Sequence, residues 1–200
     1  MGKLELNKQL KKDALLNTAF DLFTTKGINK TSISEIVDRA GVAKGTFYLY
    51  FSDKYDIRNK LIAHKASQVF RKAERSLAKT KITSLEEKII FIVDHIIDQL
   101  SANKSLLNFI SKNLSWGIFK SVLISNTPEE GINFLDIYTS MFQESDKQYE
   151  NPEILVYMIV ELVSSTSYSS ILYDEPVPIA ELKPYIFNTI REMMRSMEVS

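Results

Sequence analysis

The chain has 200 residues, 44% of them hydrophobic, which fits one or two folded domains with a buried core and argues against a disordered protein. It contains no cysteine, which excludes a disulfide framework and any thiolate metal site. The formal net charge is zero, but residues 1–81 hold 17 of the 25 Lys and Arg and only 8 of the 25 Asp and Glu, so this part favours a polyanionic partner.

Helical periodicity begins near the start of the chain, where apolar residues recur every three or four positions. A first helix, about residues 11–26, ends before Gly27. A second, about residues 32–40, opens with Ser32 and Glu35 in the spacing of a capping box and ends at Gly41. A short third helix, about residues 44–50, is followed by a long fourth one, about residues 54–78, that links the two halves of the chain.

The remaining residues also predict helices. Residues 85–100 have a wide apolar face, residues 102–125 are less regular, and another helix opens at Pro128. Pro152 begins a helix to about residue 172 that is apolar on almost every side, and a last helix covers about residues 179–197. We therefore predict an all-α protein.

The second and third helices and the turn between them have the proportions of a helix-turn-helix, over about residues 32–51. Ala40 permits close approach of the two helices, and Gly41 can take the positive φ that the turn needs. Phe47 and Phe51 are four residues apart and point inward together. The side chains left facing outward are those of Lys44, Thr46, Tyr48, Leu49 and Tyr50, with Gly45 among them.

The stretches AFDLFTTKG and TSISEIVDRAGVAKGTFYLYFSDK resemble the DNA-binding domain of TetR (tetracycline-repressor-like) transcriptional regulators, over about residues 9–60. Beyond residue 60, this chain resembles those regulators only in its length and in its helical layout. The resemblance implies an N-terminal three-helix DNA-binding domain, residues 1–53, and a larger C-terminal helical domain, residues 54–200, that binds an effector and dimerises. It also implies a homodimer, a palindromic operator and a small-molecule effector that releases a repressor from DNA.

Carried over by position, the resemblance assigns contacts to double-stranded DNA. Thr31 or Ser32 would meet a phosphate, Leu49 a thymine methyl, and Lys54 the DNA backbone. The complete implied set is Thr31, Ser32, Lys44, Gly45, Thr46, Tyr48, Leu49, Tyr50 and Lys54. Ala43 stands where the family often has Ser, so one capping hydroxyl is missing. In a competing interpretation, Tyr48 and Tyr50 are half-buried residues at the rim of a small core.

The second half predicts a dimer interface and a ligand pocket. Helices 152–172 and 179–197 carry more apolar surface than one small domain can cover, and pairing with a second copy would bury it; the alternative is that they form the subunit's own core. An effector that is apolar or aromatic would need a lining of aromatic residues. The candidates are Phe91, His95, Phe109, Trp116, Phe119, Tyr138, Phe142, Tyr157 and Tyr168.

Two other functions compete with a ligand-released repressor. One is a similar DNA-binding protein controlled by a protein partner, and the other is a helical enzyme, which is disfavoured because the sequence has no Gly-rich phosphate loop or nucleophile elbow. We expect no cofactor and no metal site, since there are only two histidines. We also expect a cytoplasmic protein, because no signal peptide and no uninterrupted membrane span are evident.

Overall fold

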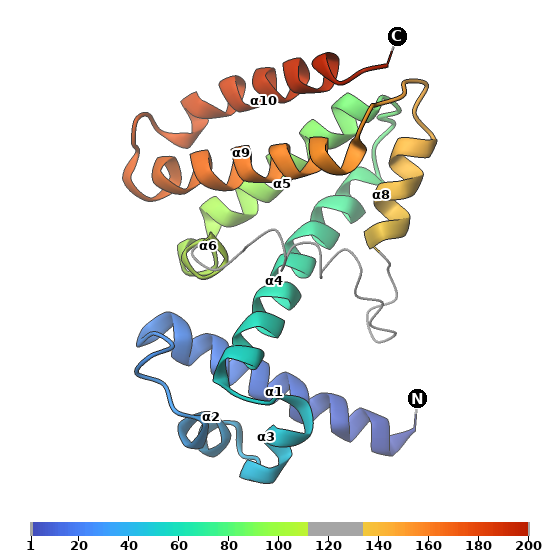
Figure 1. Cartoon of the computed structure of the whole chain (residues 1–200). Helices are drawn as coiled ribbons and strands as arrows, with labels where there is room; N and C mark the ends of the chain where they lie inside the picture. The colour runs from blue at the N-terminus through green and yellow to red at the C-terminus, as the bar shows by residue number, and fades with distance from the viewer. Residues whose placement is uncertain (1, 112–133, 200) are drawn as a thin grey trace. The chain divides into compact units, whose positions relative to one another are not determined.

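The computed structural model describes residues 2–111 and 134–199 and confirms the all-α prediction for them (Figure 1). Apart from one isolated β-bridge, between Tyr149 and Glu198, the regular elements in this part of the chain are helices. Their bounds are α1 Lys3–Thr25, α2 Ile33–Ala40, α3 Lys44–Tyr50, α4 Lys54–Leu77, α5 Leu85–Ala102, α6 Lys104–Ser111, α8 Phe134–Gln143, α9 Pro152–Tyr173 and α10 Ile179–Ser196.

The chain forms two compact units, residues 1–65 and 66–200. The division lies inside α4, so the first half of that helix belongs to the N-terminal unit and the second half to the other. The sequence-based boundary lies earlier, at residue 53. The difference arises because Ile57, Leu61 and Ile62 of α4 are fully buried and complete the N-terminal core.

The core of the N-terminal unit forms where α1, α2 and α3 pack against one another. Its buried apolar residues are Leu15, Leu16, Ala19, Leu22, Phe23, Ile36, Val37, Phe47, Phe51, Ile57, Leu61 and Ile62. Helix α1 begins at Lys3, earlier than the predicted start near residue 11. Its first turns leave Leu4, Leu6 and Leu10 exposed, so helix propensity rather than burial must extend it.

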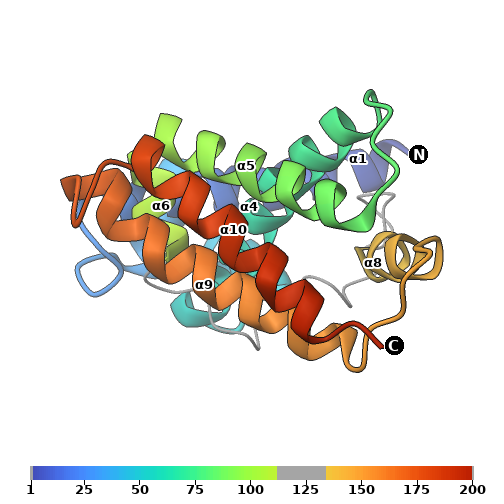
Figure 2. The ribbon, with the colours of Figure 1, turned by 90° about the horizontal axis from the view of Figure 1, so that it is seen from above.

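In the second unit, α9 and α10 form an antiparallel pair, with α5 alongside both (Figures 1 and 2). Helix α6 packs against α5 and α9. Ion pairs join α10 to α5: Lys183 Nζ lies between the carboxylates of Asp94, at 2.6 Å, and Asp98, while Arg191 contacts Glu86 at 3.1 Å and Glu87 at 3.0 Å. These acidic residues of α5 therefore help to hold the two helices together.

Helix α9 departs from its sequence prediction in two ways. It is long and apolar enough to cross a membrane, contrary to the expectation that no segment is, although core helices of soluble proteins pass the same test. It is also less buried within this chain than expected, because Ile154, Tyr157 and Met158 are each more than 40% exposed. Among the residues that the structure describes, one face of α9 therefore stays partly exposed.

Candidate nucleic-acid interface and ligand cavity

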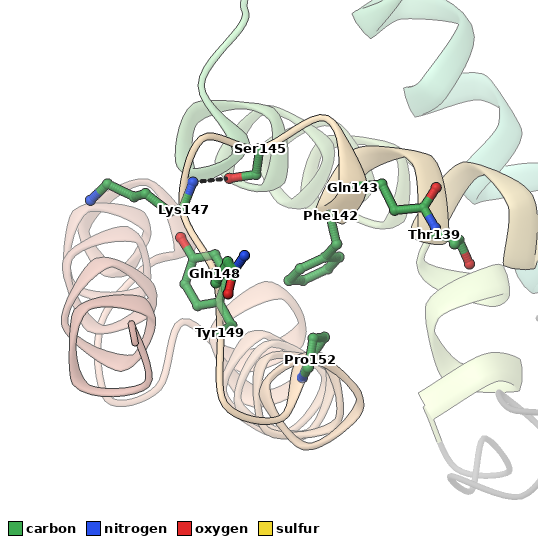
Figure 3. Close-up of a pocket in the computed structure, with 8 residues that line it drawn as sticks. All are labelled: Thr139, Phe142, Gln143, Ser145, Lys147, Gln148, Tyr149 and Pro152. Carbon is green, nitrogen blue, oxygen red and sulfur yellow. Dashed lines mark hydrogen bonds between the residues drawn. The ribbon is translucent and has the colours of Figure 1, made fainter. Parts of the chain in front are cut away.

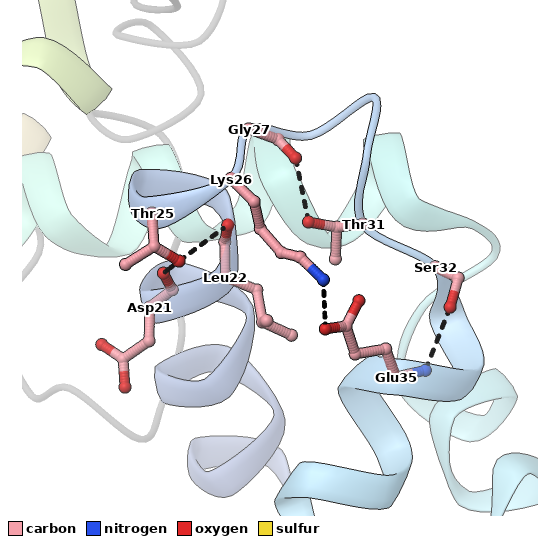
Figure 4. Close-up of polar contacts among 8 residues, drawn as sticks. All are labelled: Asp21, Leu22, Thr25, Lys26, Gly27, Thr31, Ser32 and Glu35. Carbon is pink, nitrogen blue, oxygen red and sulfur yellow. Dashed lines mark hydrogen bonds and ion pairs between the residues drawn. The ribbon is translucent and has the colours of Figure 1, made fainter.

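Helix α2 begins at a side-chain cap. The Ser32 hydroxyl accepts a hydrogen bond from the Glu35 N–H at 3.1 Å, as the capping-box spacing predicts (Figure 4). The Glu35 carboxylate, instead of returning to the start of its own helix, pairs with the ammonium of Lys26 just after α1 (Figure 4). This pair ties the end of α1 to the first turn of α2.

Thr31 closes the loop that joins α1 to α2. Its side chain is 2% exposed, and its hydroxyl donates to the Gly27 carbonyl at 2.9 Å (Figure 4). Gly27 has φ +81°, which favours glycine at this turn. A buried hydroxyl that is already bonded is poorly placed for the phosphate contact assigned to Thr31 or Ser32. The exposed Ser32 hydroxyl is the better candidate.

Lys54, at the start of α4, contacts the same loop rather than pointing away from the protein. Its ammonium donates to three carbonyl oxygens, those of Ile28 at 3.1 Å, Asn29 at 3.4 Å and Thr31 at 3.5 Å. A lysine has three N–H donors, so these contacts occupy all of them. The structure thus gives Lys54 a positioning role in the loop before α2, which differs from the predicted direct contact with the DNA backbone.

The turn between α2 and α3 has the geometry of a helix-turn-helix. Gly41 takes the left-handed conformation, φ +68°, and the Val42 N–H reaches back to the Val37 carbonyl at 3.1 Å. Ala43 precedes α3 and supplies no side-chain cap, as the sequence predicts. Burial holds α3 instead: Phe47 and Phe51 are at most 2% exposed, with ring centroids 5.4 Å apart.

The outer face of α3 is formed by Lys44, Gly45, Tyr48 and Leu49, all of them exposed. Tyr48 is 53% exposed and Leu49 79%, so Tyr48 is more than a rim residue of the core. A methyl group added at Gly45 would meet no atom within 4 Å, and nothing inside the unit explains a helical glycine there. A small residue on an exposed helix lets another molecule approach its backbone closely.

Tyr50 turns away from this outer face. It lies three residues after Phe47, on the inward side of the helix, and its hydroxyl donates to the Lys8 carbonyl in α1 at 3.1 Å. Lys60 of α4 donates to the Tyr50 carbonyl at 2.9 Å. Tyr50 therefore joins α3 to its neighbours, whereas the sequence prediction has it beside the major groove. Thr46 is half-buried at the edge of the outer face.

The junction of α3 and α4 is held by two aspartates. Asp53 caps α4 by accepting from the N–H groups of Tyr55 at 2.7 Å and Asp56 at 2.8 Å. The Asp56 carboxylate accepts from the Ser52 N–H at 2.8 Å and from Lys60 at 3.1 Å. Burial raises the pKa of Asp56, but these hydrogen bonds outweigh it, and the pKa lies below its ordinary value.

An apolar cavity of about 130 Å³ lies in the second unit. Its wall combines Ala66, Val69 and Phe70 of α4 with parts of α5, α6 and α9. The lining is mostly aliphatic and includes Val93, Leu100, Ile110 and Val163. Ser167 of α9 also lines it. A cavity of this kind suits an uncharged ligand group.

The predicted aromatic lining does not gather around this cavity. Trp116 and Phe119 lie outside the described residues, as does the side chain of Tyr138. None of the other six candidates lines it: His95 stacks on Phe91 at 4.8 Å, Phe109 is buried in α6, and Tyr168 donates to Asn108 at 2.9 Å. Phe142 and Tyr157 border two other hollows, described next.

An open hollow of about 370 Å³ lies between α8 and the start of α9 (Figure 3). Phe142 and Tyr149 meet edge to face across it, with ring centroids 5.7 Å apart. Lys147, at its edge, pairs with Glu198 at 2.8 Å. A smaller hollow, about 260 Å³, lies beside Tyr157 at the start of α9. Within the described ranges, no three His, Asp or Glu side chains are grouped so that they could hold a metal ion.

Comparisons with known proteins match the N-terminal unit most strongly. Residues 15–61 fit the family of bacterial regulatory proteins described as the tetR family. The HTH-type transcriptional regulator YvdT of Bacillus subtilis is 43% identical over 63 residues, which are 30% of this chain and 32% of YvdT. The fatty acid metabolism regulator protein of the same organism is 28% identical over 139 residues, 60% of this chain and 71% of that protein.

Solved structures resemble most of the chain. The fatty acid degradation regulator FadR of Bacillus halodurans has a TM-score of 0.62 at 21% identity, covering 89% of this chain and 96% of FadR. FadR of Bacillus subtilis, solved with stearoyl-CoA, has a TM-score of 0.62 at 19% identity and covers 88% of this chain and 96% of its own. At these identities the likeness establishes the fold. The relatives are transcriptional regulators, not enzymes.

Proposed function

We propose that this chain, which belongs to the tetR family of bacterial regulatory proteins and is a transcriptional regulator, acts as a homodimeric repressor released from a palindromic operator by a small-molecule effector with an apolar part. The outer face of α3 carries this proposal. Lys44, Tyr48 and Leu49 are exposed on a helix that is anchored from behind, and Gly45 has open space around it. Such a face fits the major groove of DNA.

The contacts with DNA divide by kind. The exposed Ser32 hydroxyl and the first turn of α2 would bind a phosphate, since helix N-termini attract anions. Lys44 and Tyr48 would reach base edges or phosphates, and Leu49 a thymine methyl. Lys54 and Tyr50 would act indirectly, because their polar groups hold α2 and α3 in place.

The operator experiment tests this face directly. DNA fragments that bind the purified protein would be recovered from the genome of its own organism, and their affinity measured for Lys44→Ala and Tyr48→Phe. Each change should cost about 1–3 kcal/mol of binding while the protein stays folded. Binding should also weaken steeply with salt, because phosphate contacts release counterions.

Two matched variants serve as controls. Tyr173→Phe removes the hydroxyl of an exposed tyrosine of the second unit, and Lys104→Ala removes an exposed lysine of the same unit. Both should keep full affinity for the fragments. Unchanged binding by Lys44→Ala and Tyr48→Phe together, or a flat response to salt, would rule out α3 as the reading helix.

For the effector, we propose an acyl-CoA or a similar amphipathic molecule with an apolar part. Support comes from the FadR relative solved with stearoyl-CoA and from the apolar cavity in the second unit. The cavity wall includes Val69 of α4, the helix that continues from the N-terminal unit. A ligand that prefers one placement of α4 would shift the recognition helices away from the spacing of about 34–36 Å that successive major grooves require.

The homodimer is proposed to form through α9 and α10. Ile154, Tyr157 and Met158 on α9 and Tyr185 on α10 are exposed apolar side chains, and pairing two copies would bury them. Ser167 and Ser170 of α9, in contrast, are buried within the subunit. Ser165 of the same helix is exposed and therefore available to a second copy.

A further inference from the structure

Ser167 is an unusual residue for the place it occupies. It lies on α9, is 2% exposed and lines the apolar cavity of the second unit. Its hydroxyl has no hydrogen-bond partner among the described residues. A buried hydroxyl without a partner is destabilising, and such groups in folded proteins call for an explanation.

Three neighbouring polar side chains of α9 have hydrogen-bond partners within the protein. Ser164, which lines the same cavity, donates to the Glu161 carbonyl at 3.4 Å. Thr166 donates to the Leu162 carbonyl at 2.6 Å, and Ser170 donates to the Val177 carbonyl at 2.6 Å. Ser167 therefore differs from residues of the same kind one turn away, and its free group is at the cavity.

We propose that Ser167 is a specificity-determining residue of the cavity, which selects an apolar ligand that carries an uncharged oxygen, a carbonyl or a hydroxyl. The Ser167 hydroxyl donates a hydrogen bond to that oxygen, and the aliphatic wall holds the carbon atoms around it. A pure hydrocarbon group fits the wall but leaves the hydroxyl unpaired. A charged group loses its hydration when it enters the cavity and meets no opposite charge on the wall, so its binding is unfavourable.

A water molecule suits this position less well than such a ligand. Buried waters make two to four hydrogen bonds to polar groups, and the described lining is apolar except for Ser167 and Ser164, whose hydroxyl is already bonded. The cavity volume of about 130 Å³ approaches the roughly 150 Å³ of an engineered apolar cavity that stays dry and binds benzene. It therefore holds one part of a larger effector; in an acyl thioester, the carbonyl is the oxygen that meets the requirement.

This inference rests on the proposed function only in treating the ligand as the effector, so its test uses no DNA. The full-length protein would be titrated with phenol and with benzene, which have nearly the same size and differ in one hydroxyl. We expect the wild-type protein to bind phenol about fivefold more tightly than benzene, the amount that one net hydrogen bond supplies. Ser167→Ala should abolish this preference, leave benzene binding intact and keep the melting temperature at or above that of wild type.

Ser164→Ala is the matched control, because it removes a hydroxyl from the same wall that is already bonded to Glu161. It should keep the preference for phenol. The proposal is overturned if Ser167→Ala retains the preference for phenol or if the wild-type protein binds neither probe. It is also overturned if the melting temperature of Ser167→Ala falls, because that would show that the hydroxyl makes a stabilising hydrogen bond within the protein. None of these results alters the operator measurements, so failure of this inference and failure of the proposed DNA binding are separable.

Discussion

The two units of this chain hold their helices together by different means. In the N-terminal unit, single polar side chains fasten short loops: Thr31 and Lys54 bind the loop before α2, and Asp53 caps α4. In the second unit, broad apolar faces of α5, α9 and α10 pack together, with ion pairs between α10 and α5 at the edge. The first arrangement fixes the direction of one small helix, and the second leaves a cavity between long ones.

The difference matters for function. A helix that reads DNA must be held rigidly, because its side chains have to meet base edges at fixed positions. A ligand domain benefits from an internal space and from helices that can repack around it. We therefore expect substitutions in the two units to differ in what they disturb, even where they cost the same stability.

The largest effects should come from matched core truncations. Phe47→Ala in the N-terminal unit and Leu155→Ala in the second unit each empty a fully buried site and should cost about 3–5 and 2–5 kcal/mol respectively. Hydrogen exchange should show faster opening of α2 and α3 in the first variant and of α5, α9 and α10 in the second. Faster exchange throughout both units in either variant would mean that they unfold as one body.

Smaller effects on stability are expected when either of two glycines of the helix-turn-helix is replaced by alanine, and the two variants should differ in the sign of the effect. Gly41→Ala places a side chain at φ +68° and should destabilise the protein by about 1–2 kcal/mol. Gly45→Ala adds a methyl group in open space and should stabilise it by about 0.4–1 kcal/mol while weakening operator binding. Urea denaturation and DNA titration check both signs. A Gly45→Ala variant that binds DNA normally would leave this glycine without a role.

The smallest effect concerns the ion pairs of the second unit. Lys183→Gln should cost about 0.5–1 kcal/mol, because the ammonium pairs with Asp94 and Asp98 near the surface. Burial lowers the pKa of Lys183, but the hydrogen bonds to these carboxylates raise it above the ordinary value of 10.5. A raised pKa in the folded state means that the contribution is complete below about pH 10.5 and is lost as the pH rises through the folded-state pKa.

Urea denaturation of wild type and variant at a series of pH values measures this contribution. The difference between the two proteins should be constant from neutral pH to about pH 10 and shrink at higher pH. Lys104→Gln, a change at an exposed lysine of α6, is the control and should leave stability unchanged throughout. A difference for Lys183→Gln that grows with pH would contradict the assigned ion pairs.

The sequence predicts the N-terminal unit well where the signals are local. The Ser32 cap, the positive φ of Gly41 and the inward pair Phe47 and Phe51 all follow from spacing within a few residues. The same reasoning does not find the contacts of Lys54 and Tyr50 within the protein, because their polar groups bond to residues 23 to 42 positions away. Their contacts with DNA stay predictions. A pattern within one helix shows that a side chain faces outward or inward, but not which distant carbonyl lies within reach.

In the second unit, too, the sequence predicts the helices but not the contacts between residues that are far apart in the chain. Helix positions follow from periodicity, and α9 and α10 match their predicted ranges closely. The cavity was not predictable from the aromatic residues, because it forms where aliphatic residues of α4, α5, α6 and α9 fail to fill the space. A serine at position 167 within an apolar run is a local signal, yet only the structure reveals that its hydroxyl has no partner.

Ala43 also offers a way to observe the protein at work. The natural chain contains no cysteine, so Ala43→Cys would create a unique thiol at an exposed position directly before α3, while Gly45 keeps its open surroundings. A maleimide reagent would modify that thiol rapidly in the free protein and slowly when α3 is docked against another molecule. Because the modification is irreversible, its initial rate with DNA alone and with DNA plus effector would report the docked fraction in each mixture.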